Sequence, residues 1–99
     1  MKQDDCNLVT TLTVEVSIPY RIYLPNNYDT LVDGHPLLLF LHGAGYRGDD
    51  LNVMAKIGLP KYIEDGADLP FVTVCPQCPR GEFWNPLQLS VLLDKIIAD

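Results

Sequence analysis

The sequence predicts an α/β fold, in which a mixed sheet starts with antiparallel strands and continues with parallel strand–helix units. Two observations predict it. Alternating or continuously apolar segments typical of strands occur at residues 8–18, 20–24, 36–41 and 71–75. Segments with helix signals separate the last two of these strands and follow the last one. An alternation of strand and helix in the second half of a chain favours a parallel arrangement there.

Composition favours one globular unit. The chain has 99 residues, of which 47% are hydrophobic and 20% charged, close to globular averages. Thirteen acidic against seven basic residues give a net charge of −6, which makes nucleic acid and anionic membranes poor partners. No apolar run approaches the roughly 20 residues that span a bilayer, and an acidic pair near the N-terminus is unlike a signal peptide. We therefore expect a single cytoplasmic domain segment covering residues 1–99.

The first two predicted strands lie on either side of Pro19. Residues 8–18 alternate between apolar and polar side chains, which predicts a strand with one face toward a core. Residues 20–24 resume the alternation after the proline. Turn-forming residues at 25–29 and 33–34 then predict a surface loop. The apolar face of the first strand consists of Leu12, Val14, Val16 and Ile18, and its polar face of Thr11, Thr13, Glu15 and Ser17.

Residues 36–41 do not alternate and predict the next strand. A continuous apolar run of this length, bounded by turn residues, is typical of a central strand covered on both faces. Asp49 or Asp50 then offers an N-cap for a short helix, which Gly58 ends. A further helical turn is expected over residues 60–64.

The strongest helix signal follows the short strand predicted at residues 71–75. Asn85 suits the N-cap, and Pro86 suits the first helical position. Apolar residues then recur at helical spacing and form one stripe, which needs a sheet or a helix to cover it. The stripe consists of Leu89, Leu92, Leu93, Ile96 and Ile97.

Five motifs follow one another between residues 20 and 93. They are residues 20–25 (Tyr-Arg-Ile-Tyr-Leu-Pro), 39–45 (Leu-Phe-Leu-His-Gly-Ala-Gly), 47–50 (Arg-Gly-Asp-Asp), 69–71 (Leu-Pro-Phe), and 76–79 (Pro-Gln-Cys-Pro) with Trp84. In this order and spacing they resemble the N-terminal half of α/β-hydrolase-fold serine esterases. Within this family, the motifs resemble most the branch that contains phospholipase/carboxylesterases, polyhydroxybutyrate depolymerase-like esterases and predicted peptidases of the prolyl oligopeptidase clan. The resemblance implies an incomplete α/β-hydrolase fold and transfer of an acyl group from a carboxylic ester, or a peptide, to water.

The resemblance identifies His42, Gly43, Ala44 and Gly45 as an oxyanion-hole loop. Such hydrolases stabilise the oxyanion with a backbone N–H from the loop after the third strand and with the N–H that follows the nucleophile. We expect the Ala44 amide to be the donor, Gly43 and Gly45 to shape the loop, and His42 to orient it through hydrogen bonds. The alternative is that these four residues form only a strand-to-helix turn.

A catalytic triad is not identifiable in these 99 residues. The two serines, Ser17 and Ser90, lack the glycine-flanked turn of a nucleophile elbow. In the family the nucleophile, acid and base come later in the sequence, so this polypeptide alone is expected to be inactive as an esterase. Without the strand that bears the nucleophile, residues 36–41 would form a sheet edge, which favours self-association.

Other residues leave alternatives open. Phe83 and Trp84 either line a substrate pocket or pack under their own loop. Cys75 and Cys78 form a C-x-x-C, but no helix begins there, which disfavours a redox dithiol, and no metal-ligand spacing supports zinc. The main alternative to a hydrolase segment is a noncatalytic interaction module or a degenerate gene product. We expect no metal and no cofactor.

Overall fold

The computed structural model describes residues 1–28 and 34–98, and its centre is a three-stranded mixed sheet. The strands are β1 (Tyr20–Tyr23), β2 (Leu37–Leu39) and β3 (Val72–Pro76), in the order β1-β3-β2. β1 runs antiparallel to β3, whereas β2 runs parallel to it. The predicted mixed α/β architecture is therefore confirmed. The middle of the predicted surface loop, residues 29–33, lies outside the described residues, as does residue 99.

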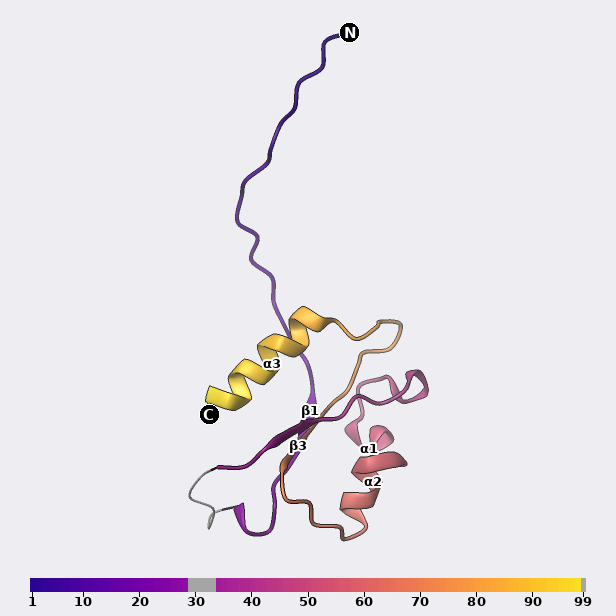
Figure 1. Ribbon diagram of the computed structural model, residues 1–99. Coiled ribbons are helices and arrows are strands. Elements are labelled where there is room, and N and C mark those ends of the chain that lie inside the picture. Colours follow the sequence, from indigo (N-terminus) through magenta and orange to yellow (C-terminus); the bar gives the residue numbers. More distant parts are fainter. Residues whose placement is uncertain (29–33, 99) are drawn as a thin grey trace.

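Helices cover both faces of the sheet (Figure 1). The short helices α1 (Leu51–Met54) and α2 (Gly58–Glu64) lie on one face, and α3 (Pro86–Ala98) lies on the other. The predicted caps form: the Asp50 side chain accepts from the Asn52 amide, and the Asn85 side chain accepts from the amides of Leu87 and Gln88. No helix in residues 1–28 and 34–98 is long and apolar enough to cross a bilayer.

The core lies along β3, whose five residues are all buried. On the α3 face, Val72 and Val74 pack with Leu92, and burial of each such side chain contributes roughly 1.5–3 kcal/mol. Ile97, the last residue of the predicted apolar stripe, is 72% exposed, so the sheet covers the stripe only in part. The partly buried residues around this core are Ile18, Tyr20, Leu37, Leu39 and Ile96.

A polar cluster fastens α1 and α2 to β1 on the opposite face. The Arg21 guanidinium donates to the Glu64 carboxylate at 2.7 Å and to the Asn52 side-chain oxygen at 3.0 Å. The Tyr23 hydroxyl donates to the same Glu64 oxygen at 2.7 Å. Arg21 and Tyr23 alternate with apolar residues along β1, so one short strand serves both faces of the sheet.

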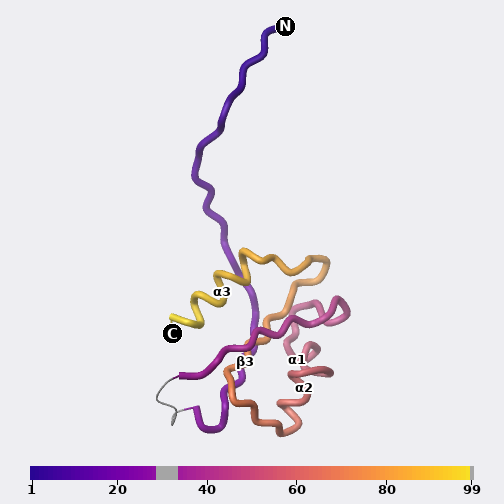
Figure 2. The backbone as a smooth tube through the Cα atoms, viewed as in Figure 1, coloured from indigo at the N-terminus to yellow at the C-terminus, as the bar shows by residue number. Residues whose placement is uncertain are grey.

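The prediction of a strand at residues 8–18 is wrong for this structure. Residues 1–17 form an extended arm that leads away from the sheet, whereas Ile18 and Pro19 still contact it, and the longest dimension of the molecule is 70 Å (Figures 1 and 2). Leu12 and Val14 are 83% and 61% exposed. A strand is stabilised by hydrogen bonds and side-chain pairs with a neighbouring strand, and no described residue supplies that neighbour.

Two further expectations are corrected near α1. Leu37, Leu38 and Leu39 are half-buried rather than covered on both faces, although their position at an edge of the sheet agrees with the edge expected for residues 36–41. Gly58 does not end the first helix, because α1 already ends at Met54 with Ala55 as its C-cap; with φ +72°, Gly58 is instead the first residue of α2. Glycine tolerates the left-handed conformation that this abrupt change of direction requires.

Candidate functional site

The candidate loop runs from the end of β2 to the start of α1 and contains one turn of 3₁₀ helix, η2 (Ala44–Tyr46). The Gly43 carbonyl accepts from the Tyr46 amide at 3.1 Å, and the Ala44 carbonyl accepts from the Arg47 amide at 3.5 Å. Ala44 is exposed. Its own amide is the first of the turn, and within the described residues no acceptor bonds to it. The loop therefore contains an exposed residue whose backbone N–H is not bonded within the described residues.

His42 is buried beneath this loop, with 5% of its surface exposed. Its Nε2 accepts a hydrogen bond from the Cys78 amide at 3.0 Å, which requires an unprotonated Nε2. The proton of the neutral ring is thereby assigned to Nδ1, which donates to the Gly43 carbonyl at 2.6 Å. The ring links the turn after β3 to the loop after β2. Both ring nitrogens are therefore engaged with backbone groups.

Trp84 and Phe83 complete the lining of the cavity beside the candidate loop. The Trp84 indole N–H donates to the His42 carbonyl at 3.2 Å, and the two rings lie 4.8 Å apart. The Arg47 guanidinium lies 4.8 Å above the Phe83 ring, a cation–π contact. These side chains line an open cavity of about 90 Å³. Its lining is His42, Gly43, Ala44, Arg47, Cys78, Phe83 and Trp84, so of the predicted site residues only Gly45 is outside it.

Gln77 holds the loop in place and was not singled out as a site residue from the sequence. It is fully buried and directly follows β3. Its amide nitrogen donates to the carbonyls of Tyr46 (3.0 Å) and Asp50 (2.9 Å), while the neighbouring Cys78 carbonyl accepts from the Gly48 amide at 3.0 Å. The only signal in the sequence was an uncharged polar side chain directly after a buried strand, inside the motif of residues 76–79.

The loop's requirement for glycine lies at Gly48 rather than at Gly43 or Gly45. Gly48 has φ +148°, whereas Gly43 has φ −75° and Gly45 has no positive φ. A Cβ atom placed on Gly43 or Gly45 would meet no heavy atom within 4 Å. The prediction that these two glycines permit a tight turn is therefore not supported by their backbone angles. Their lack of side chains instead leaves open space next to the Ala44 amide.

The C-x-x-C motif has the environment of a structural element. Cys75 and Cys78 are both buried free thiols. Burial raises the pKa of the Cys75 thiol to about 11, opposite to the shift that activates a nucleophilic cysteine. Within the part of the chain that the structure describes, no three metal-ligating side chains gather into a group.

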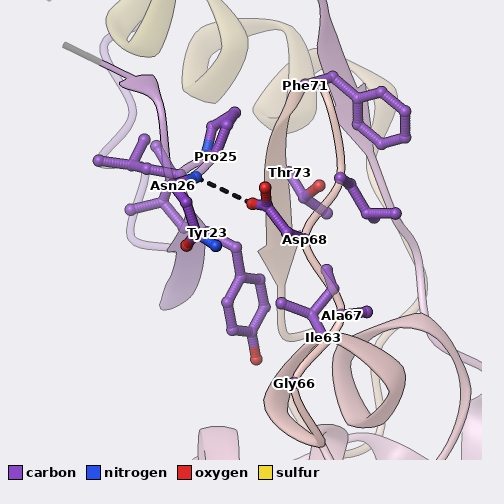
Figure 3. Close-up of a pocket in the computed structure, with 12 residues that line it drawn as sticks. Tyr23, Pro25, Asn26, Ile63, Gly66, Ala67, Asp68, Phe71 and Thr73 are labelled. Atoms are coloured by element: carbon purple, nitrogen blue, oxygen red, sulfur yellow. Dashed lines mark hydrogen bonds between the residues drawn. The ribbon is translucent and has the colours of Figure 1, made fainter. Parts of the chain in front are cut away.

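Two larger cavities lie at the other end of the sheet. One, of about 470 Å³, lies between the end of β1 and the segment after α2, where the Asp68 carboxylate accepts from the Asn26 amide at 2.9 Å (Figure 3). The other, of about 660 Å³, lies beside the last turn of α3. Both contain a residue from the amino end of β3, and the second also contains Leu37 from the amino end of β2, whereas the candidate loop follows the carboxyl end of β2. Ligands of open α/β sheets bind at carboxyl ends of strands, so volume alone does not identify the functional end.

Comparisons with known proteins support a partial esterase-like fold. A solved structure of a thermostable esterase superposes with a TM-score of 0.50 and 26% sequence identity. The match covers 83% of this chain and 26% of the esterase, so this chain corresponds to about a quarter of that protein's length. No protein-family model and no curated protein matches the sequence.

Proposed function

We propose that this chain is a segment of a serine hydrolase that acts on carboxylic esters, and that it supplies one donor of the oxyanion hole. The observation that carries the proposal is the amide of the exposed residue Ala44, which has no acceptor among the described residues; Ala44 lines a cavity with Phe83 and Trp84. A backbone N–H held in place before the substrate arrives stabilises the negative charge that develops on a carbonyl oxygen in the transition state. The esterase neighbour supports the same reaction class.

In this proposal His42 and Gln77 are positioning residues. His42 fixes the first residues of the loop by its bonds to Gly43 and Cys78, and Gln77 fixes its far end through two carbonyls. The Trp84 indole N–H also donates a hydrogen bond to the His42 carbonyl. These bonds hold the Ala44 amide in one place, and oxyanion stabilisation depends on such preorganised geometry. The small 90 Å³ cavity is then one wall of a substrate site.

The nucleophile, the acid and the base belong to polypeptide outside these 99 residues in this proposal. Loss of an oxyanion donor lowers the rate by about 10²–10³, whereas loss of a serine nucleophile lowers it by about 10⁶. The purified chain is therefore expected not to hydrolyse p-nitrophenyl acetate above buffer and not to react with a fluorophosphonate. Stoichiometric labelling by the fluorophosphonate would overturn this part of the proposal.

The donor role is tested by titration of ¹⁵N-labelled chain with an alkyl phosphonate monoester, an anionic mimic of the tetrahedral adduct. The Ala44 amide proton is expected to move downfield as it binds the oxyanion. Ala44→Pro removes that N–H alone, because Pro suits the first position of a helical turn and Gly43 at ψ 172° already has the conformation required before proline. Ala44→Gly, which keeps the N–H, is the matched control.

The titration has a clear contrary outcome. If Ala44→Pro binds the phosphonate as tightly as Ala44→Gly does, the donor lies elsewhere. If the Ala44 resonance stays unchanged at saturation, the loop is only a strand-to-helix turn, and the esterase proposal loses the observation on which it rests.

A further inference from the structure

We propose that the extended N-terminal arm and β1 together form a dimerisation strand, which pairs antiparallel with the same strand of a second copy of this chain. The proposal concerns an interaction surface and is independent of the esterase proposal. It rests on three observations: an unpaired edge of β1, an arm with the alternation of a strand, and one register that matches both side-chain faces.

The outer edge of β1 is unpaired in the described residues. The Pro19 carbonyl accepts from the Gln77 amide at 2.9 Å, so residue 19 points its backbone groups toward β3. In an antiparallel pair, every second residue points the same way, which directs the N–H and C=O of Tyr20 and Ile22 to the other side. β1 is the outermost strand of the order β1-β3-β2, so these groups face away from the sheet. An edge of this kind is a template for strand addition.

The arm has the pattern that this edge requires. Its even-numbered apolar residues share a side-chain face with Tyr20 and Ile22 on the α3 side, and Ile18 already packs on the core there. Ile22 and Leu24 are 41% and 49% exposed, so apolar surface beside the edge is left uncovered. A strand placed next to β1 would cover it.

One register satisfies both faces. If Glu15 lies opposite Arg21 of the second copy, then Val14 lies opposite Ile22 and Val16 opposite Tyr20 of that copy. Each apolar residue then lies opposite an apolar residue, and the Glu15 carboxylate lies opposite the Arg21 guanidinium. Because the dimer is symmetric, each of these pairs occurs twice. Two of the five Arg21 N–H groups donate in the observed cluster, which leaves the guanidinium capacity for a further acceptor.

Pairing with a second copy fits better than a hairpin within one chain. The same register within one chain needs a three-residue loop at residues 17–19, and such loops place a residue, usually glycine, in the left-handed conformation. Ser17-Ile18-Pro19 contains no glycine, and the Pro19 carbonyl is bonded to β3 in extended geometry. The missing N–H of Pro19 is on the β3 side, so it removes no bond from the proposed interface.

The test is the mass of the 99-residue chain in solution, measured by sedimentation equilibrium from micromolar to millimolar concentration. A dimer, twice 11.1 kDa, is expected. Val14→Pro removes an N–H that points into the interface and should raise the dimer dissociation constant by at least about 100-fold, because the symmetric contact loses it twice. Thr13→Pro is the matched control, since its N–H points to solvent on an edge strand, where proline is tolerated.

A charge reversal tests the register. Glu15→Lys places a cation opposite Arg21 and should raise the dissociation constant about tenfold, whereas Asp4→Lys, the same change outside the paired segment, should not. A monomer at all concentrations overturns the proposal, whether or not its arm is protected from hydrogen exchange. A dimer that survives Val14→Pro but dissociates in Leu37→Pro, whose N–H lies at the outer edge of β2, also overturns it.

Discussion

The Cys78 amide donates a hydrogen bond to Nε2 of His42 at 3.0 Å, although the two residues are 36 positions apart. This bond joins the turns that follow the two parallel strands of the sheet. A buried backbone N–H left without an acceptor costs about 1–3 kcal/mol, so the bond couples the stability of the fold to the position of the candidate loop.

Substitutions of His42 can distinguish the contributions that its two ring nitrogens make to stability. His42→Asn places an amide N–H donor near the Nδ1 position and leaves the Cys78 amide without an acceptor, which should lower the free energy of unfolding by about 1–3 kcal/mol. The longer side chain in His42→Gln reaches the Nε2 position and should recover part of that loss. Urea unfolding measures both variants. If the two lose equal stability, the Cys78 bond contributes nothing and only packing beneath Trp84 matters.

Gln77 should be sensitive to a change that keeps its shape. Gln77→Glu turns a donor that faces the Tyr46 and Asp50 carbonyls into an acceptor, and the buried oxygens then repel. We expect a loss of about 2–4 kcal/mol in urea unfolding, together with faster amide hydrogen exchange at Gly48. Gln88→Glu, on the first turn of α3, is the control for the charge. Wild-type exchange at Gly48 in Gln77→Glu would contradict the bracing role.

Glycine substitutions should distinguish conformation from available space. Gly58→Ala places a side chain at φ +72°, with its Cβ 3.4 Å from the Phe40 ring, and should cost about 1–2 kcal/mol. Gly45→Ala has neither constraint and should change stability by less than about 0.5 kcal/mol. Thermal unfolding of the two variants side by side checks the contrast. A Gly45→Ala loss as large as that of Gly58→Ala would show that the loop is more constrained than its geometry indicates.

The helices and strands that could be predicted are those whose sequence signals lie within the element itself or within one turn of its end. Asn85 and Pro86 marked the start of α3, and Asp50 marked that of α1, because capping depends on residues within one helical turn. Strand positions also followed from local patterns: residues 20–24 and 71–75 became Tyr20–Tyr23 and Val72–Pro76.

The features that could not be predicted from the sequence depend on contacts with residues that are distant in the chain. Residues 8–18 have the alternation of a strand, yet pairing requires a neighbour that alternation does not provide. The role of Gln77 was hidden for a similar reason, because its acceptors lie 31 and 27 positions earlier and only the closed fold brings them together. The resemblance pointed to residues 42–45 as a candidate loop, whereas its hydrogen bonds to Gln77 are visible only in the structure.

The Tyr23–Glu64 pair predicts how stability changes at alkaline pH. Burial, and then the hydrogen bond to the Glu64 carboxylate, raise the pKa of Tyr23 from 10.0 to about 12. Because the folded state holds the proton more tightly than the unfolded state, this contribution to stability is fully present below pH 10. It is lost as the pH rises from about 10 to 12. Tyr23→Phe should flatten this part of the pH profile of unfolding, whereas Tyr62→Phe, on the exposed side of α2, should leave it unchanged.

The same pair acts in the opposite direction at acid pH. Hydrogen bonds from Tyr23 and Arg21 hold the pKa of the Glu64 carboxyl below its usual value, so its contribution is present above pH 4.5 and is lost as the pH falls further. Glu64→Gln should remove both the acid and part of the alkaline dependence, because one oxygen serves both donors. An absorbance titration of the tyrosinates, with wild type and Tyr23→Phe compared, isolates the Tyr23 step. If that difference titrates near pH 10, Tyr23 is not bonded to Glu64 in solution, and the attachment of α2 to β1 must rest on Arg21 alone.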